Sequence, residues 1–96
     1  MKTTQKRVHI IYSGAVHGVG FRFTAEEIAN SLGLKGSAQN CPDGTVEVIV
    51  EGEESDIASF MDRIKKAMGS YIRSSKVERQ EATGEFDSFG IKFYYE

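Results

Sequence analysis

The chain has 96 residues, of which 40% are hydrophobic and 27% charged, and its formal net charge at pH 7 is −2. This length suits one domain with its own core, and the composition is typical of globular proteins rather than of disordered or fibrous ones. The slightly acidic balance lacks the basic footprint of nucleic-acid binding, and no apolar run is long enough to span a bilayer. We therefore expect one domain over residues 1–96 without nucleic-acid or membrane partners.

The first half of the chain predicts a strand, a loop and a helix. Residues 7–13 are rich in β-branched side chains and alternate as a strand does. A glycine-rich loop follows over residues 14–20. From Phe21 to Leu32 the apolar residues recur at helical spacing, and Gly33 is well placed to end the helix.

A hairpin is predicted next. Residues 35–40 and 45–50 read as two strands, and they flank Pro42-Asp43-Gly44. Proline presets the backbone of a turn and glycine accepts conformations that other residues resist.

The second half of the chain predicts a helix and two strands. Apolar residues recur at intervals of three and four from Ile57 to Met68, and acidic residues precede them, as suits a helix N-terminus. Strand candidates follow at residues 75–82 and 89–95. The order predicts an α+β, ferredoxin-like βαββαβ sandwich, in which two helices cover one face of an antiparallel sheet.

The glycine-rich loop is the first candidate site. A loop that leaves a strand and opens a helix directs backbone N–H groups into one concavity, which attracts anions. Arg22, directly after the loop, offers a planar fork of donors suited to two phosphate oxygens. The stretch matches neither a Walker loop nor a dinucleotide fingerprint. On spacing alone, a second interpretation stands equally: the glycines only shape a tight connection, and Arg22 is a solvated helix residue.

Two motifs resemble the acylphosphatase family. Its first signature, Gly-x-Val-Gln-Gly-Val-x-Phe-Arg, is similar to Gly14-Ala15-Val16-His17-Gly18-Val19-Gly20-Phe21-Arg22. Its second is similar to Gly36-Ser37-Ala38-Gln39-Asn40, followed by Gly44-Thr45-Val46 and Gly52. Both motifs agree in order and spacing, and histidine stands at position 17 where the family usually has glutamine.

The resemblance implies hydrolysis of the carboxyl–phosphate bond of a small-molecule acyl phosphate. Inorganic phosphate would be product and inhibitor, and no metal or cofactor is expected. Arg22 occupies the family's phosphate-binding arginine position and Asn40 its water-orienting asparagine position. The loop residues expected to bind substrate are Ala15, Val16, His17, Gly18 and Val19. We expect a monomer, and the lone Cys41 together with the lack of a secretory signal predicts a cytoplasmic protein.

Alternatives remain for single residues and for the function. His17 could act as a base near neutral pH, although the usual glutamine cannot take a proton. Cys41 adjoins Asn40 on the opposite strand face and is not expected to be a nucleophile.

A non-enzymatic anion sensor would share the loop and Arg22, but it has no evident need for Asn40. An RNA-recognition module is set aside, because only one strand precedes the loop and the chain is acidic.

Overall fold

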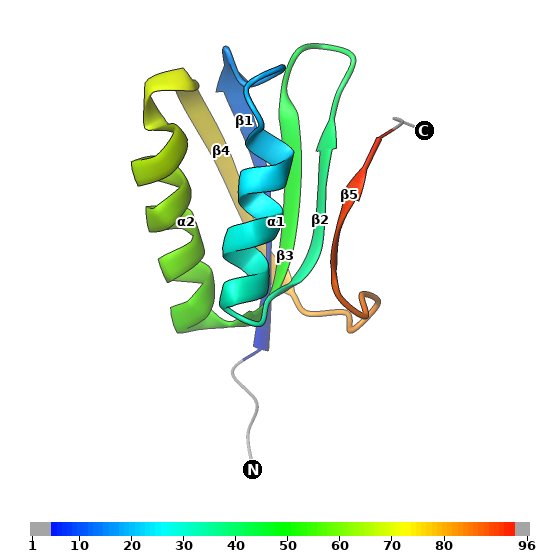
Figure 1. The fold of residues 1–96 in the computed structure, drawn as a ribbon. Helices are drawn as coiled ribbons and strands as arrows, with labels where there is room; N and C mark the ends of the chain where they lie inside the picture. The colour runs from blue at the N-terminus through cyan, green and yellow to red at the C-terminus, as the bar shows by residue number, and fades with distance from the viewer. Residues whose placement is uncertain (1–4, 94–96) are drawn as a thin grey trace.

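The computed structural model describes residues 5–93, which form a sheet covered on one face by two helices (Figure 1). In chain order the elements are β1 (Gln5–Gly14), α1 (Phe21–Ser31), β2 (Lys35–Asn40), β3 (Val46–Glu53), α2 (Glu54–Met68), a 3-10 turn (Gly69–Tyr71), β4 (Ile72–Glu81) and β5 (Phe89–Lys92). This confirms the ferredoxin-like α+β fold expected from the sequence. The end of the strand expected over 89–95 lies outside the described residues.

The sheet has the strand order β4-β1-β3-β2-β5. Strand β1 pairs antiparallel with both β3 and β4, and β2 pairs antiparallel with β3. The antiparallel pairing expected from the sequence is therefore confirmed for β1 to β4. Strand β5 extends it as a parallel neighbour of β2 and makes the sheet mixed, because the chain passes from one edge of the sheet to the other before β5 begins.

The core fills the space between the sheet and the helices. Val8 and Ile10 of β1 are fully buried, and the Tyr12 ring lies 4.9 Å from the Phe21 ring at the start of α1. Burial raises the pKa of the Tyr12 phenol. Both helices present apolar side chains at helical spacing to this layer: Phe21, Ala25, Ile28 and Ala29 from α1, and Ile57, Phe60, Ile64 and Met68 from α2. Neither helix has the length and apolarity to cross a membrane.

A buried carboxylate fixes the connection between β4 and β5. Glu51 of β3 is 5% exposed and accepts hydrogen bonds from the backbone N–H groups of Thr83 and Gly84, at 3.0 and 2.9 Å. The Thr83 hydroxyl and the Arg7 guanidinium also donate to it, at 2.8 and 2.9 Å. Because these bonds join β3 and β1 to the connection, they set the path by which the chain reaches β5.

Candidate active site

The β1–α1 loop and the β2–β3 turn lie at the same end of the molecule, uppermost in Figure 1. Gly18 and Gly20 of the loop have φ angles of 75° and 76°, in the left-handed region that side chains disfavour. A Cβ at either position would meet nothing within 4 Å. The loop therefore needs glycine there for backbone conformation rather than for space.

Gly20 is also the N-cap residue of helix α1, and no side chain among residues 5–93 caps this helix. The first intrahelical bond recorded there runs from the Thr24 N–H to the Gly20 carbonyl, at 3.0 Å. The N–H groups of the first turn have no partner within the helix, and the positive end of the helix dipole lies at the same place. This helix start can therefore bind an anion.

A cavity of about 160 Å³ opens at this helix start. Arg22 enters it from the first turn of α1, and Asn40 enters it from the end of β2, which packs beside α1. The full lining is Val16, Gly18, Gly20, Phe21, Arg22, Phe23 and Asn40. The structure thus brings the arginine and the asparagine singled out in the sequence to one small site.

Strand β5 and the residue after it hold the guanidinium of Arg22. Its Nη1 donates to the Lys92 carbonyl at 3.1 Å, and its Cζ lies 5.2 Å from the centroid of the Phe93 ring. A guanidinium over an aromatic face is attracted by the ring quadrupole. Sequence reasoning missed both partners, because they lie at the far end of the chain and carry no motif.

Asn40 is half-buried at the cavity, and its side-chain amide forms no hydrogen bond with any of residues 5–93. An amide offers both an acceptor oxygen and two N–H donors. The group is therefore open to a water molecule or to a substrate oxygen.

Three of the expected loop residues do not line the cavity. The Ala15 N–H donates to the Tyr71 carbonyl at 2.9 Å, so it is committed to the fold. Val19 packs against the core. The His17 side chain reaches the β2–β3 turn, where its Nε2 donates to the Thr45 carbonyl at 2.8 Å. This hydrogen bond links the β1–α1 loop to the β2–β3 turn, which follows Asn40, so the His17 ring has a structural role.

Cys41 lies beside Asn40 but not in the cavity lining. Burial raises the pKa of its thiol, which lowers the thiolate fraction that a nucleophile needs. Across the described part of the chain, no group of three or more His, Cys, Asp or Glu side chains is placed to hold a metal ion.

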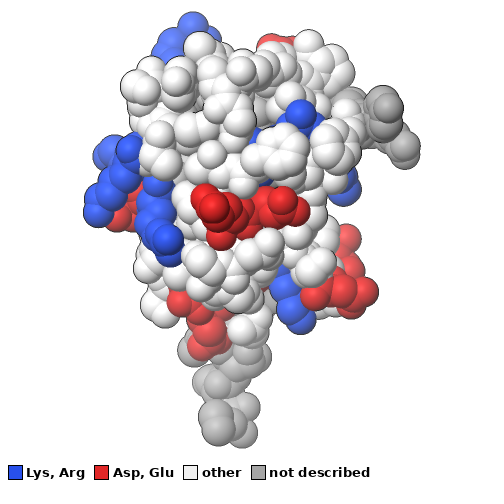
Figure 2. All heavy atoms as spheres, in the orientation of Figure 1, with Lys and Arg blue, Asp and Glu red and all other residues white. Residues whose placement is uncertain are grey.

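Charged side chains are sparse at this end of the molecule on the face that Figure 2 draws. Figure 2 shows acidic and basic side chains interspersed over the face it draws, with mostly uncharged surface at the end that carries the loop. An anion at the cavity would therefore be held by the nearby N–H groups and by Arg22, rather than by a broad basic surface.

Comparison with known proteins gives consistent matches. The family model described as Acylphosphatase matches residues 8–91. An acylphosphatase of Lactobacillus johnsonii is 43% identical over 95 residues, which is 97% of this chain and 100% of the relative. One of Syntrophobacter fumaroxidans is 37% identical over 93% of each chain. The crystal structure of acylphosphatase from Bacillus subtilis aligns with a TM-score of 0.84 at 31% identity, covering 91% of this chain and 98% of that one.

Proposed function

This chain belongs to the acylphosphatase family and is a hydrolase of acyl phosphates, and from that premise we propose that the cavity of Gly18, Arg22 and Asn40 is its active site. The reaction there cleaves the carboxyl–phosphate bond and releases a carboxylate and inorganic phosphate. The observation that carries the proposal is the meeting of Arg22 and Asn40 in one cavity at an uncapped helix start. The anion sensor that the sequence left open is set aside, because the curated relatives are acylphosphatases.

The phosphoryl group binds at the start of α1. Free N–H groups of the loop and of the first helical turn donate to its oxygens, and the guanidinium of Arg22 adds a planar pair of donors. Because Lys92 and Phe93 hold the guanidinium before substrate arrives, little of its side-chain entropy is left to lose on binding.

Asn40 orients the attacking water. Its amide oxygen accepts a hydrogen bond from the water, so an oxygen lone pair faces phosphorus opposite the carboxylate. The water oxygen bonds to phosphorus as the bond from phosphorus to the carboxyl oxygen breaks, and the bonding pair leaves with the carboxylate. The water proton passes to a phosphoryl oxygen. A carboxylate is a good leaving group, so positioning and charge stabilisation suffice without a covalent intermediate or a strong general acid.

We further propose that turnover needs neither metal nor cofactor and that inorganic phosphate inhibits competitively. The substrate is a small molecule, with no nucleic acid or membrane taking part. Arg22 and Asn40 meet in one cavity within one chain, which supports the proposal that one copy is a complete catalytic unit.

The test is phosphate release from benzoyl phosphate by the purified full chain, with and without a chelator. We expect release well above the spontaneous rate and unchanged by the chelator. A phosphate monoester, whose leaving group is much poorer, is the matched control and should be hydrolysed far more slowly. A folded protein that leaves benzoyl phosphate at its background rate contradicts the assignment, and chelator-sensitive turnover contradicts metal independence.

Binding is tested separately by thermal unfolding in phosphate, against chloride of equal ionic strength. A ligand at 100 times its Kd stabilises the folded state by about 2.7 kcal/mol, so the melting temperature should rise in phosphate alone. Equal melting temperatures in the two salts would argue against a preformed phosphate site.

A further inference from the structure

Strand β4 is an exposed edge of the sheet. Within residues 5–93 it pairs with β1 on one side only, and it stands first in the strand order. Every residue from Arg73 to Glu81 is exposed. An edge strand presents a row of unpaired backbone N–H and C=O groups that can pair with another strand.

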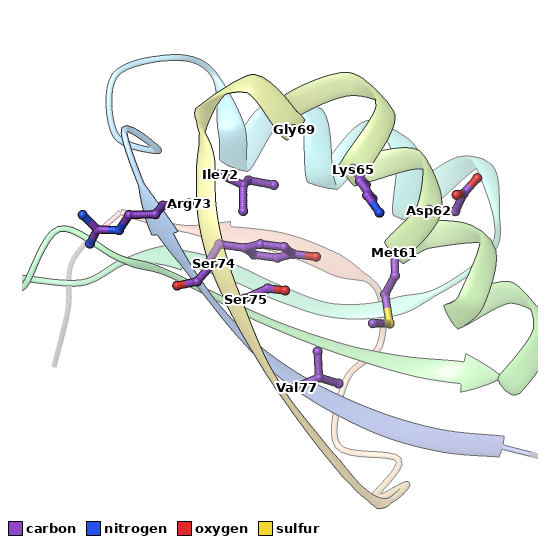
Figure 3. Close-up of a pocket in the computed structure, with 10 residues that line it drawn as sticks. Met61, Asp62, Lys65, Gly69, Ile72, Arg73, Ser74, Ser75 and Val77 are labelled. Atoms are coloured by element: carbon purple, nitrogen blue, oxygen red, sulfur yellow. The ribbon is translucent and has the colours of Figure 1, made fainter.

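Apolar side chains lie beside this edge. Helix α2 packs mainly over β3 and β1, and it leaves a groove of about 440 Å³ between itself and β4 (Figure 3). Met61 of α2 and Val77 of β4 point toward each other across the groove, and Val77 is 39% exposed. The edge therefore combines free backbone groups with accessible apolar surface.

The charges of β4 are self-complementary in one antiparallel register. If two copies of β4 pair with Val77 opposite Val77, Lys76 of each copy faces Glu78 of the other. In the same register Arg73 of each copy faces Glu81 of the other. Opposite charges directly across a strand pair stabilise it, and so does a β-branched pair.

Neighbouring registers lack this match. A shift by one residue in one direction sets Lys76 opposite Arg79, and a shift by two sets Lys76 opposite Lys76 or Glu78 opposite Glu78. Like charges directly opposite destabilise a strand pair. The charges of β4 therefore favour the register centred on Val77 over these neighbouring registers.

We propose that β4 pairs antiparallel with β4 of a second copy, centred on Val77, and joins the two sheets into one. The pairing is isologous, with a two-fold axis perpendicular to the sheet, so both helix layers lie on the same side and the two grooves flank the new strand pair. Asn40 stands on β2, separated from β4 by β1 and β3, so the catalytic cavity stays open.

The dimer forms at high protein concentration. One strand pair buries less than the roughly 1,200 Å² of a standard interface, and such contacts are weak and transient. The monomer expected from the sequence is then the dilute form of the protein, and the proposal is independent of the active-site assignment.

Charge reversal within one chain tests the register. Glu78→Lys sets lysine against Lys76 at both symmetric contacts, and Lys76→Glu sets glutamate against Glu78. The double variant Lys76→Glu/Glu78→Lys restores both opposite-charge pairs. Both positions are exposed and lie outside the cavity lining. Melting curves and hydrolysis of benzoyl phosphate report whether each variant is folded.

Sedimentation equilibrium gives the masses. Wild type should approach twice its 10.6 kDa chain mass as the concentration nears about 1 mM. Each single variant should dimerise about tenfold more weakly or worse, and the double variant should recover. A single variant that dimerises as wild type does, or a double variant that fails to recover, overturns the proposal. So does a wild type that stays monomeric throughout, which would point to an extended segment of another protein as the occupant of this edge.

Discussion

Replacing Glu51 with glutamine should remove an acid-sensitive contribution to stability. The carboxylate is nearly inaccessible and receives donors from Thr83, Gly84 and Arg7. Burial by itself raises the pKa of Glu51, but these donors outweigh it and hold the pKa at about 2, against an ordinary value of 4.5. Glutamine keeps the shape of the side chain but cannot carry the charge.

The size of the effect follows from the two pKa values. The difference, 4.5 minus about 2, corresponds to about 3 kcal/mol, since one pKa unit is worth about 1.4 kcal/mol. The folded pKa is the lower one, so the unfolded chain binds more protons between the two values. The contribution is therefore fully present above about pH 5 and is lost as the pH falls through 4.5 toward 2.

Urea titrations followed by circular dichroism measure this, because the chain has no tryptophan for fluorescence. The free energy of unfolding of wild type minus that of Glu51→Gln should shrink by about 3 kcal/mol between pH 7 and pH 2. Thr83→Val, which removes one of the donors, should show a smaller change of the same sign. If the wild-type and Glu51→Gln curves run parallel over this range, the carboxylate does not carry the assigned contribution.

The active site yields four further expectations. Asn40→Ala should lower kcat by about 10² to 10³ with phosphate inhibition near wild type, since the amide acts on the water; weaker phosphate binding with normal kcat would move Asn40 into the phosphate site. Arg22→Lys should lose both phosphate affinity and turnover, as titration and kinetics will show, because lysine lacks the planar fork; a lysine variant with near-normal values would refute bidentate binding. Cys41→Ser should stay within a few-fold of wild-type activity, and a large loss together with a trapped phospho-enzyme would revive a covalent route. His17→Gln should keep its turnover in the benzoyl phosphate assay, because the glutamine amide can donate to the Thr45 carbonyl as His17 Nε2 does. A large loss of kcat in this folded variant would mean that His17 acts as a base.

The local elements could be predicted because their signals lie within a few residues. The first helix begins at Phe21 and the second strand covers Lys35–Asn40, as the spacing and the Pro42-Asp43-Gly44 turn indicated. Arg22 and Asn40 could be singled out because each stands in a motif, and the structure places both at one cavity.

The rest depends on contacts between residues far apart in the chain. The parallel pairing of β5 with β2 depends on how the chain crosses after β4, and that path is fixed by Glu51, which lies 32 residues before Thr83. The support of Arg22 by Lys92 spans 70 residues. The Ala15 N–H was expected to face phosphate but donates to the Tyr71 carbonyl, beside the point where β4 has one extra residue, Arg73, in its pairing with β1. Neither hydrophobic periodicity nor a local motif predicts contacts between residues so far apart in the chain.

The position of β1 between β4 and β3 has a consequence for synthesis on the ribosome. Strand β1 leaves the ribosome before the other strands of this sheet, yet one of its two neighbours is β4, whose residues 72–81 are made only after β2, β3 and α2. Until then one edge of β1 has no partner, and the nascent chain can hold only a sheet of β1, β2 and β3. Contacts of such large sequence separation fold more slowly than local ones, and an unpaired edge beside apolar side chains is prone to aggregate. The nascent chain is therefore expected to depend on chaperones most between the emergence of β3 and that of β4, and enzymatic activity should appear only after β5, which holds Arg22, has emerged.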